Sequence, residues 1–228
     1  MGKKKVEDAV EEDAGVSEEV EKRESKTLFW VFVVVGVVFA AVLVPYFWNE
    51  SSKNFEFSGI DWVVEDYQDL RIFHGRFLSL TNPNLYYNIF LRTDPRVNDV
   101  EVVGKLDSFK YGGIVSLSPE IDACRGDLSR VMLDLGAFLK QGVGVGPIES
   151  ATSDEIVANE SDRKFVVCDN VLDRTVLLIE IGETRIVQDE DNPYCYTLYA
   201  ENCEDARVVE KFMVKSVEDF RDSYPVKE

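Results

Sequence analysis

The sequence contains few of the residues on which hydrolases and zinc proteins depend. Its 228 residues include one histidine, His74, and none of its four cysteines belongs to a C-x-x-C pair. Because zinc sites use cysteine and histidine at regular spacings, we expect no metal site. There is no G-x-S-x-G sequence, and a serine or cysteine hydrolase would have to use His74 as its base. We interpret His74 as a half-buried strand residue, and we assign no catalytic residue and no cofactor.

Charged residues are absent from residues 27–49, a run of 23 mostly apolar residues. At about 1.5 Å per residue, a helix of this length can cross a hydrocarbon core of roughly 30 Å. Trp30 lies near one end of the run, and Tyr46 and Trp48 lie near the other, as is typical of aromatic residues at the depth of the lipid headgroups. The run therefore predicts a transmembrane helix that tethers the chain to membrane lipid.

Basic residues flank this predicted span unevenly. Only Lys53 follows it closely, whereas three basic residues precede it, namely Lys22, Arg23 and Lys26. Since the cytoplasmic flank carries the excess of lysine and arginine, we expect residues 50–228 to lie outside the cytoplasm. A cleaved signal peptide is the competing interpretation, but the apolar run is too long and ends without a small-residue cleavage site. We therefore predict a single-pass signal anchor in the cell membrane, with a cytoplasmic N-terminus and an extracytoplasmic C-terminal domain.

Acidic residues outnumber basic ones on both sides of the predicted span. The tail, residues 1–26, has six basic and nine acidic residues and few large apolar ones, so we expect it to be disordered. Residues 50–228 hold 19 basic and 34 acidic residues, a net charge of −15. This excess argues against nucleic acid or anionic lipid as a partner, and it suits either solubility or the attraction of basic partners.

The apolar pattern beyond the span predicts strands, then a helix, then strands, then a second helix. The first strands are indicated at residues 69–80, 85–92, 100–106 and 113–117. Helical periodicity covers residues 127–140 and about 203–220. Between the helices, strands are indicated at 143–148 and 164–168, and then in an up-down-up meander at 175–181, 184–188 and 194–200. This order predicts an α+β fold with a mostly antiparallel sheet and two helices.

The same pattern divides the outer part into three segments. Residues 50–66 are interpreted as a stalk, residues 67–120 as a β-rich part, and residues 121–228 as an αβ part that holds both helices. The second boundary lies near Cys124, where strand-like segments give way to helical periodicity. The sequence leaves open whether these two parts are separate domains.

Four cysteines in an outward-facing domain predict two disulfides. In the expected meander, Cys168 precedes the first strand and Cys195 opens the third, so both lie at the same end of the sheet. Cys203 follows the third strand, whose extended length of about 16 Å exceeds the roughly 7 Å that a disulfide allows between Cα atoms. We therefore predict the pairs Cys168–Cys195 and Cys124–Cys203, the second of which would tie together the starts of both helices.

Two polar segments have a chemistry of their own. Asn159, in the sequence Asn-Glu-Ser, is a glycosylation acceptor within a polar stretch. A second acceptor sequence, at Asn49, lies too close to the predicted bilayer to be used. Residues 189–192 gather oxygen ligands that suit calcium, but they lack the EF-hand pattern, and a solvated acidic turn is the simpler interpretation.

A characteristic order of short segments runs along the chain. It consists of residues 90–96, the residues around each of the four cysteines, and residues 209–212. This order, over residues 67–213, resembles a group of uncharacterised archaeal proteins anchored to the membrane by one N-terminal helix. Where that family often has Glu-Arg-Phe, this chain has Glu210-Lys211-Phe212. The resemblance implies an extracytoplasmic domain with four cysteines, and it implies no activity.

These features lead to three hypotheses about function. The leading one is an interaction protein that contacts an envelope component or another membrane protein, since the domain is anchored, acidic and poor in catalytic residue types. The alternative is an envelope hydrolase acting on glycans, which requires two carboxylates facing each other across a cleft at roughly 5–10 Å, one of them poorly solvated. A module that binds a small ligand would instead require an apolar pocket.

Overall fold

The computed structural model describes residues 29–44, 53–82 and 84–224. The chain forms two compact units, Met1–Ser52 and Lys53–Glu228.

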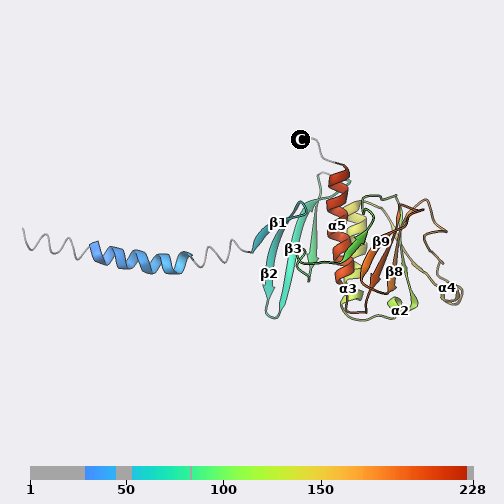
Figure 1. Ribbon diagram of the computed structural model, residues 1–228, viewed down its shortest axis with the longest axis horizontal. Helices are drawn as coiled ribbons and strands as arrows, with labels where there is room; N and C mark the ends of the chain where they lie inside the picture. The colour runs from blue at the N-terminus through green and yellow to red at the C-terminus, as the bar shows by residue number, and fades with distance from the viewer. Residues whose placement is uncertain (1–28, 45–52, 83, 225–228) are drawn as a thin grey trace, which may run out of the picture. The chain divides into compact units, whose positions relative to one another are not determined.

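The first unit contains a helix over residues 29–44, drawn in blue in Figure 1. Its side chains are largely exposed, Trp30 among them. Within the described residues, we find no helix that is both long and apolar enough to span a membrane. The ends of the predicted span, with Tyr46 and Trp48, lie outside the described residues, as do the basic residues Lys22, Arg23 and Lys26. The transmembrane helix therefore stays a prediction.

The second unit begins with a four-stranded antiparallel sheet in the order β1-β2-β3-β4. Its strands are β1 (Asn54–Phe57), β2 (Ile60–Tyr67), β3 (Leu70–Leu78) and β4 (Tyr86–Leu91). Strand β1 and most of β2 lie in residues 50–66, which we expected to be a stalk. That expectation differs from the structure because Ile60 and Trp62 are buried in the core, which makes this segment part of the folded domain.

A six-stranded sheet follows, in the order β5-β9-β10-β8-β6-β7. Its strands are β5 (Glu101–Val103), β6 (Gly113–Leu117), β7 (Ile148–Thr152), β8 (Thr175–Ile181), β9 (Arg185–Gln188) and β10 (Cys195–Ala200). Only the β9–β10 pair is antiparallel, and the other four pairs are parallel. The fold is thus α+β with one antiparallel sheet, as expected, but the larger sheet is mixed and mostly parallel.

The expected meander has the right strand directions and the wrong strand order. Strand β10 lies between β8 and β9, and it runs parallel to β8, with Cys195 opposite Val176. Residues 175–179 of β8 are all buried, which is typical of a parallel strand covered on both faces. In a meander with one solvent-exposed face, buried and exposed residues would alternate along β8. Instead, β8 has a continuous run of buried residues.

The second unit has more helices than the two that we expected. They are α2 (Pro119–Asp122), α3 (Asp127–Ala137), the π-helix η1 (Phe138–Val143), α4 (Glu155–Ser161) and α5 (Arg207–Ser223). The predicted helix at 127–140 corresponds to α3 and the first half of η1. Helix α5 begins four residues later than the expected start near residue 203, because Cys203 and Glu204 lie in a turn in which the Asn202 side chain accepts the N–H of Glu204.

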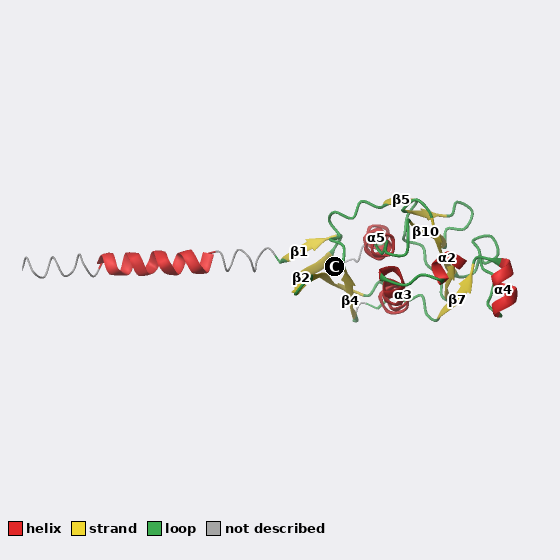
Figure 2. Ribbon diagram, turned by 90° about the horizontal axis from the view of Figure 1, so that it is seen from below, coloured by secondary structure: helices red, strands yellow, loops and turns green. Residues whose placement is uncertain are grey.

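Helices α3 and α5 lie between the two sheets, as Figure 2 shows. The ring of Phe212 in α5 contacts Tyr196 in β10, with ring centroids 5.6 Å apart. On the other side, Phe138 contacts Phe77 in β3 at 6.3 Å. One continuous core therefore joins both sheets through the helices. Within residues 53–82 and 84–224, no further layer covers the far face of the first sheet.

The disulfide prediction is confirmed, since the structure pairs Cys124 with Cys203 and Cys168 with Cys195. The Cα atoms lie 5.3 and 5.5 Å apart, respectively. The parallel pairing of β8 and β10 brings Cys168 and Cys195 to one end of the sheet, as the strand directions required. All the cysteines of the chain are thereby paired.

Candidate functional site

The uncovered face of the first sheet carries a set of large apolar side chains, which we call the outer patch. Its members are between 38% and 57% exposed, and they are Val63, Tyr67, Leu70, Leu78, Tyr86 and Phe90. They belong to β2, β3 and β4, whose alternate side chains point away from the helices. Cross-strand pairs place Tyr67 opposite Leu70 and Leu78 opposite Tyr86. The patch thus extends along most of the sheet.

His74 lies at the centre of the outer patch. It is opposite Val63 in β2 and Phe90 in β4. Its Nδ1 lies 3.0 Å from Glu65 Oε1 and its Nε2 lies 3.1 Å from Asn88 Oδ1. The ring of Phe90 stacks on the imidazole at 4.5 Å. His74 is therefore a partly exposed strand residue whose ring is held in place by both neighbouring strands.

Glu65 is the acidic member of this central cluster. The Tyr67 hydroxyl donates to Glu65 Oε2 at 2.5 Å. The hydrogen bonds from Tyr67 and then from His74 hold the pKa of Glu65 below its usual value. The same hydrogen bond to Glu65, and then the negative charge of Glu65, raise the pKa of the Tyr67 hydroxyl. Glu65 is thus an ionised carboxylate that is surrounded by hydrogen-bond donors.

The rim of the outer patch carries both signs of charge. The guanidinium of Arg76 lies over the ring of Tyr86, 4.1 Å from its centroid. Asp61 lies opposite Arg76 in the strand register. Large apolar side chains bordered by charged groups are typical of a protein-binding surface.

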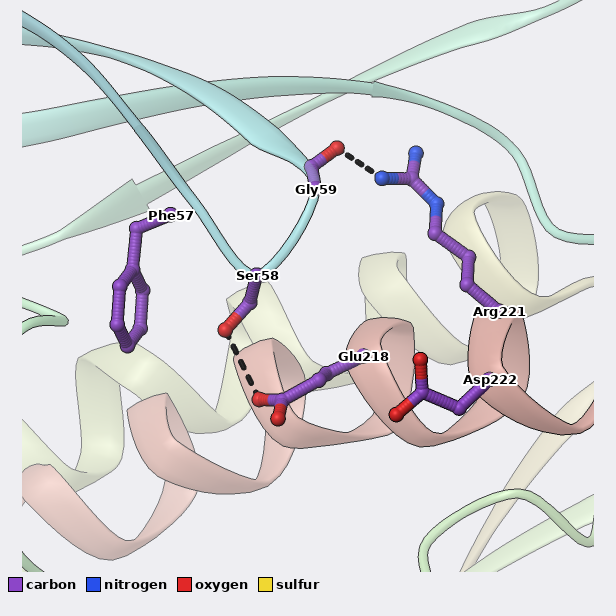
Figure 3. Close-up of a pocket in the computed structure, with 6 residues that line it drawn as sticks. All are labelled: Phe57, Ser58, Gly59, Glu218, Arg221 and Asp222. Atoms are coloured by element: carbon purple, nitrogen blue, oxygen red, sulfur yellow. Dashed lines mark hydrogen bonds between the residues drawn. The ribbon is translucent and has the colours of Figure 1, made fainter.

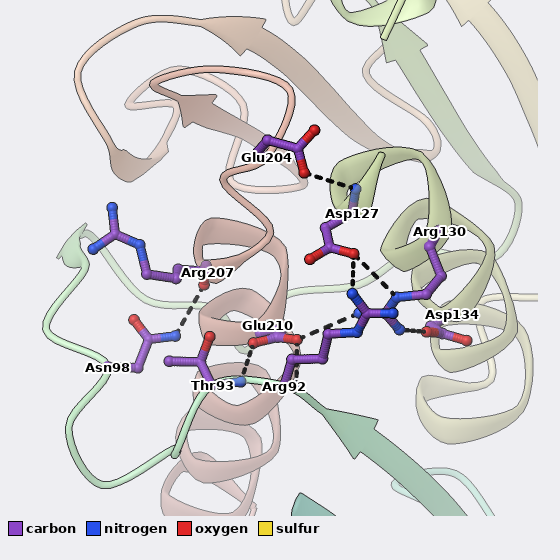
Figure 4. Close-up of polar contacts among 9 residues, drawn as sticks. All are labelled: Arg92, Thr93, Asn98, Asp127, Arg130, Asp134, Glu204, Arg207 and Glu210. Carbon is purple, nitrogen blue, oxygen red and sulfur yellow. Dashed lines mark hydrogen bonds and ion pairs between the residues drawn. The ribbon is translucent and has the colours of Figure 1, made fainter. Parts of the chain in front are cut away.

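A second polar cluster surrounds Glu210, which is fully buried in α5 (Figure 4). Its carboxylate accepts the backbone N–H groups of Arg92 at 2.8 Å and Thr93 at 3.0 Å. The guanidinium of Arg130 lies 3.8 Å from the same carboxylate and 3.0 Å from Asp134. Burial raises the pKa of Glu210 above its usual value. Since both carboxylate oxygens accept backbone N–H groups and Arg130 lies beside them, this cluster joins the end of β4 to α3 and α5.

The two ends of the resemblance pattern meet at this cluster. Arg92 and Thr93 belong to the segment 90–96, and Glu210 belongs to the segment 209–212. Lys211, which follows Glu210, donates to the backbone oxygen of Asn98 at 2.7 Å. These two segments therefore contact each other inside the fold, where α5 is bonded to the chain that follows β4.

A pocket lies between the β1–β2 turn and the end of α5 (Figure 3). The Ser58 hydroxyl donates to Glu218 at 2.9 Å, and Arg221 donates to the backbone oxygen of Gly59. Glu218 and Asp222 line the pocket from one helix, one turn apart. They do not face each other across a cleft as the two carboxylates of a glycosidase do. The contacts instead tie the first hairpin to α5.

The hydrolase hypothesis requires one poorly solvated carboxylate, and Glu180 is such a group. Burial, and then the charge of Glu120, raise the pKa of Glu180 above its usual value. Neither residue lines the pocket near α5 or a second pocket beside β6. These two residues therefore lie in neither of the two pockets that the described residues form beside α5 and β6.

The remaining predicted residues are placed as follows. Asn159 is exposed in α4, so its side chain is accessible. In the acidic turn at 189–192, Asp189 Oδ1 accepts the N–H of Asn192 at 2.7 Å, and Asn192 donates to the backbone oxygen of Cys168. Among the described residues, no group of three or more histidine, cysteine or acidic side chains is placed to hold a metal ion.

The sequence did not lead us to the outer patch. In β3, both faces carry apolar residues, with Ile72 and Leu78 on one and Phe73 and Phe77 on the other. A strand with one solvent-exposed face usually alternates apolar and polar residues. Apolar residues on both faces of β3 were therefore the feature of the sequence that could have indicated the outer patch.

Comparison with protein-family models, with curated proteins and with solved structures finds no match to this chain. The resemblance to archaeal membrane-anchored proteins therefore stays a prediction.

Proposed function

We propose that this chain is a membrane-anchored interaction protein that binds a partner protein outside the cytoplasm through the outer patch. The observation that carries the proposal is the gathering of six large, exposed apolar side chains on one face of one sheet. Single exposed apolar residues are common on any surface, whereas a patch with a polar rim is typical of an interaction site.

The aromatic members of the outer patch are suited to act as anchors. Phe90 is stacked on His74, and Tyr86 is covered on one side by Arg76. Side chains held in this way lose little conformational freedom when a partner binds, which lowers the entropic cost of association. Aromatic residues and arginine are also the types that most often dominate binding free energy.

The charge of the domain favours a partner with a basic surface around an apolar centre. Residues 50–228 carry a net charge of −15. Such a field accelerates the approach of a basic partner and disfavours an acidic one. The carboxylates of Glu65 and Asp61, at or beside the patch, would then meet basic residues of the partner.

The proposed location rests on the sequence and on the disulfides. The uncharged run at 27–49 and the basic residues before it predict an anchor with residues 50–228 outside. Two disulfides suit an oxidising compartment. The resemblance to anchored archaeal proteins implies the same arrangement.

The proposal is tested by site-specific photocrosslinking in native membranes. A photoreactive amino acid is placed at Tyr86, in the outer patch, or at Leu133, which is 78% exposed on α3 and serves as the matched control. We expect a discrete adduct with one partner from position 86 and not from position 133. Equal adducts from both positions, or none from position 86, would contradict the proposal.

A further inference from the structure

A second surface feature, separate from the outer patch, is a pocket of about 490 Å³ beside β6, which we call the loop pocket. Its apolar lining comes from Ile114 in β6 and from Phe165, Val166 and Val171 in the segment that precedes β8. The lining also includes two basic residues, Lys164 and Arg174. The volume lies within the range of roughly 300–1,000 Å³ that is usual for small-molecule sites.

The segment that forms the wall of the loop pocket is fixed by covalent and polar contacts. Cys168 is joined to Cys195 at the start of β10. Asn192 donates to the backbone oxygens of Cys168 and Val171, each at 2.9 Å. Within the segment, Asn170 donates to the backbone oxygen of Phe165 and accepts the N–H of Val167, both at 3.1 Å. The pocket is therefore preformed, and a ligand need not order it.

The two basic residues of the loop pocket already hold a carboxylate. Arg174 Nη1 donates to Glu149 Oε1 at 3.0 Å, and Lys164 donates to the other oxygen of the same group. Lys164 and then Arg174 hold the pKa of Glu149 below its usual value. Arg174 has five N–H donors and Lys164 has three, so donors remain for a second carboxylate. Lys164 is 65% exposed and Arg174 38%, which leaves both heads accessible from the solvent.

We propose that the loop pocket binds a carboxylate that is attached to an aliphatic group. The aliphatic group would lie on Ile114 and Val171, and the carboxylate would bond to Lys164 and Arg174. Such a ligand contacts both the apolar and the basic residues of the lining, whereas a purely apolar or a purely ionic ligand would contact only one of the two groups. The site does not depend on the outer patch, and its failure would leave the interaction function untouched.

The same chemistry has two sources, a free amino acid and the carboxyl terminus of a peptide. Asp173 also lines the pocket, and it would pair with the ammonium group of a free amino acid. A peptide terminus has no such ammonium group next to its carboxylate. Leucine and N-acetyl-leucine therefore represent the two sources, and N-acetyl-leucinamide, which lacks the carboxylate, is the control ligand.

The experiment uses the full chain in lipid nanodiscs with labelled isoleucine and valine methyl groups. We expect N-acetyl-leucine or leucine to shift the signals of Ile114 and Val171 saturably, and N-acetyl-leucinamide to bind at least tenfold more weakly. The variant Lys164→Gln/Arg174→Gln should also lose at least about tenfold in affinity, because charge-assisted hydrogen bonds are the strong ones. Lys105→Gln/Lys140→Gln, which removes two exposed charges elsewhere, should bind as the wild type does.

The outcomes separate the sources and can overturn the site. Tighter binding of leucine that is weakened by Asp173→Asn assigns the free amino acid, whereas equal or tighter binding of N-acetyl-leucine assigns the peptide terminus. The proposal is overturned if neither ligand gives saturable shifts or if the amide binds equally well. Unchanged affinity in Lys164→Gln/Arg174→Gln, with methyl signals that report a folded domain, would also overturn it.

Discussion

Glu210 in α5 accepts the backbone N–H of Arg92, which precedes it by 118 residues, at 2.8 Å. Through this bond and its partner from Thr93, one buried carboxylate fixes the chain where it leaves β4. The outer patch lies on the opposite face of the same sheet. The Glu210 cluster therefore holds the sheet on the helices, and the patch is presented on a rigid support.

The first prediction concerns the pH dependence of this joint. Burial raises the pKa of Glu210, so the folded chain binds this proton more tightly than the unfolded chain does. Stability contributed by the proton is fully present below the ordinary pKa near 4.5 and is lost as the pH rises through the raised value. The free energy of unfolding of the wild type minus that of Glu210→Gln should thus decline from pH 4 upwards. Urea unfolding across this range measures it, and a flat difference would contradict the assignment.

The two disulfides should differ in their contribution to stability. Cys124–Cys203 closes a separation of 79 residues and Cys168–Cys195 one of 27. By the loop-entropy relation, removal of the first should cost about 4.5 kcal/mol and removal of the second about 3.5 kcal/mol. Paired substitutions to alanine, followed by urea unfolding, measure both costs. A larger cost for the Cys168–Cys195 pair would show that chain entropy does not set the order.

Gly75 and Gly136 should respond to alanine in opposite directions. A Cβ at Gly75 would lie 2.7 Å from both Ile89 and the ring of Trp62, whereas one at Gly136 would meet nothing within 4 Å. We expect Gly75→Ala to lose about 1–3 kcal/mol of stability through overpacking. Gly136→Ala, inside α3, should gain about 0.5–1 kcal/mol because alanine favours the helix. Thermal unfolding of both variants gives the two signs, and matching signs would be inconsistent with this packing.

The topology is tested with cysteine labelling. Since all native cysteines are paired, a single introduced cysteine reacts alone with a membrane-impermeant maleimide. In intact cells, Leu133→Cys should be labelled, because position 133 is exposed in the domain that we place outside. Ser17→Cys, in the N-terminal tail, should be labelled only after the membrane is opened. Labelling of position 17 in intact cells would reverse the proposed orientation.

Much of the fold of the second unit could be predicted from local patterns. Strands such as Gly113–Leu117 and Thr175–Ile181 have the predicted bounds, because apolar and β-branched residues mark them strongly. The disulfide pairs followed from the strand directions and from the length of the strand between Cys195 and Cys203. The place of β10 between β8 and β9 could not be predicted, because pairing order depends on contacts between distant segments.

The candidate sites depend even more on distant contacts. Lys164 and Glu149 are 15 residues apart, and they meet because the segment that holds Lys164 returns beside β7, where the N–H of Thr152 donates to the backbone oxygen of Lys164. The neighbours of His74 come from the two flanking strands, β2 and β4, and no local pattern relates Glu65 to Asn88. The outer patch is visible only when the opposite face of the sheet is seen to be covered by α3 and α5.

The outer patch as a partner-binding surface is tested most directly by the abundance of the native complex. Mild detergent extracts of membranes are compared by native electrophoresis for the wild type, for Tyr86→Ser/Phe90→Ser, and for Leu133→Ser/Ile156→Ser, which changes two exposed apolar residues elsewhere. The account predicts that the patch variant loses the slower-migrating complex while the control variant keeps it, at equal chain levels. An undiminished complex in the patch variant, or an equal loss in the control, would contradict the account.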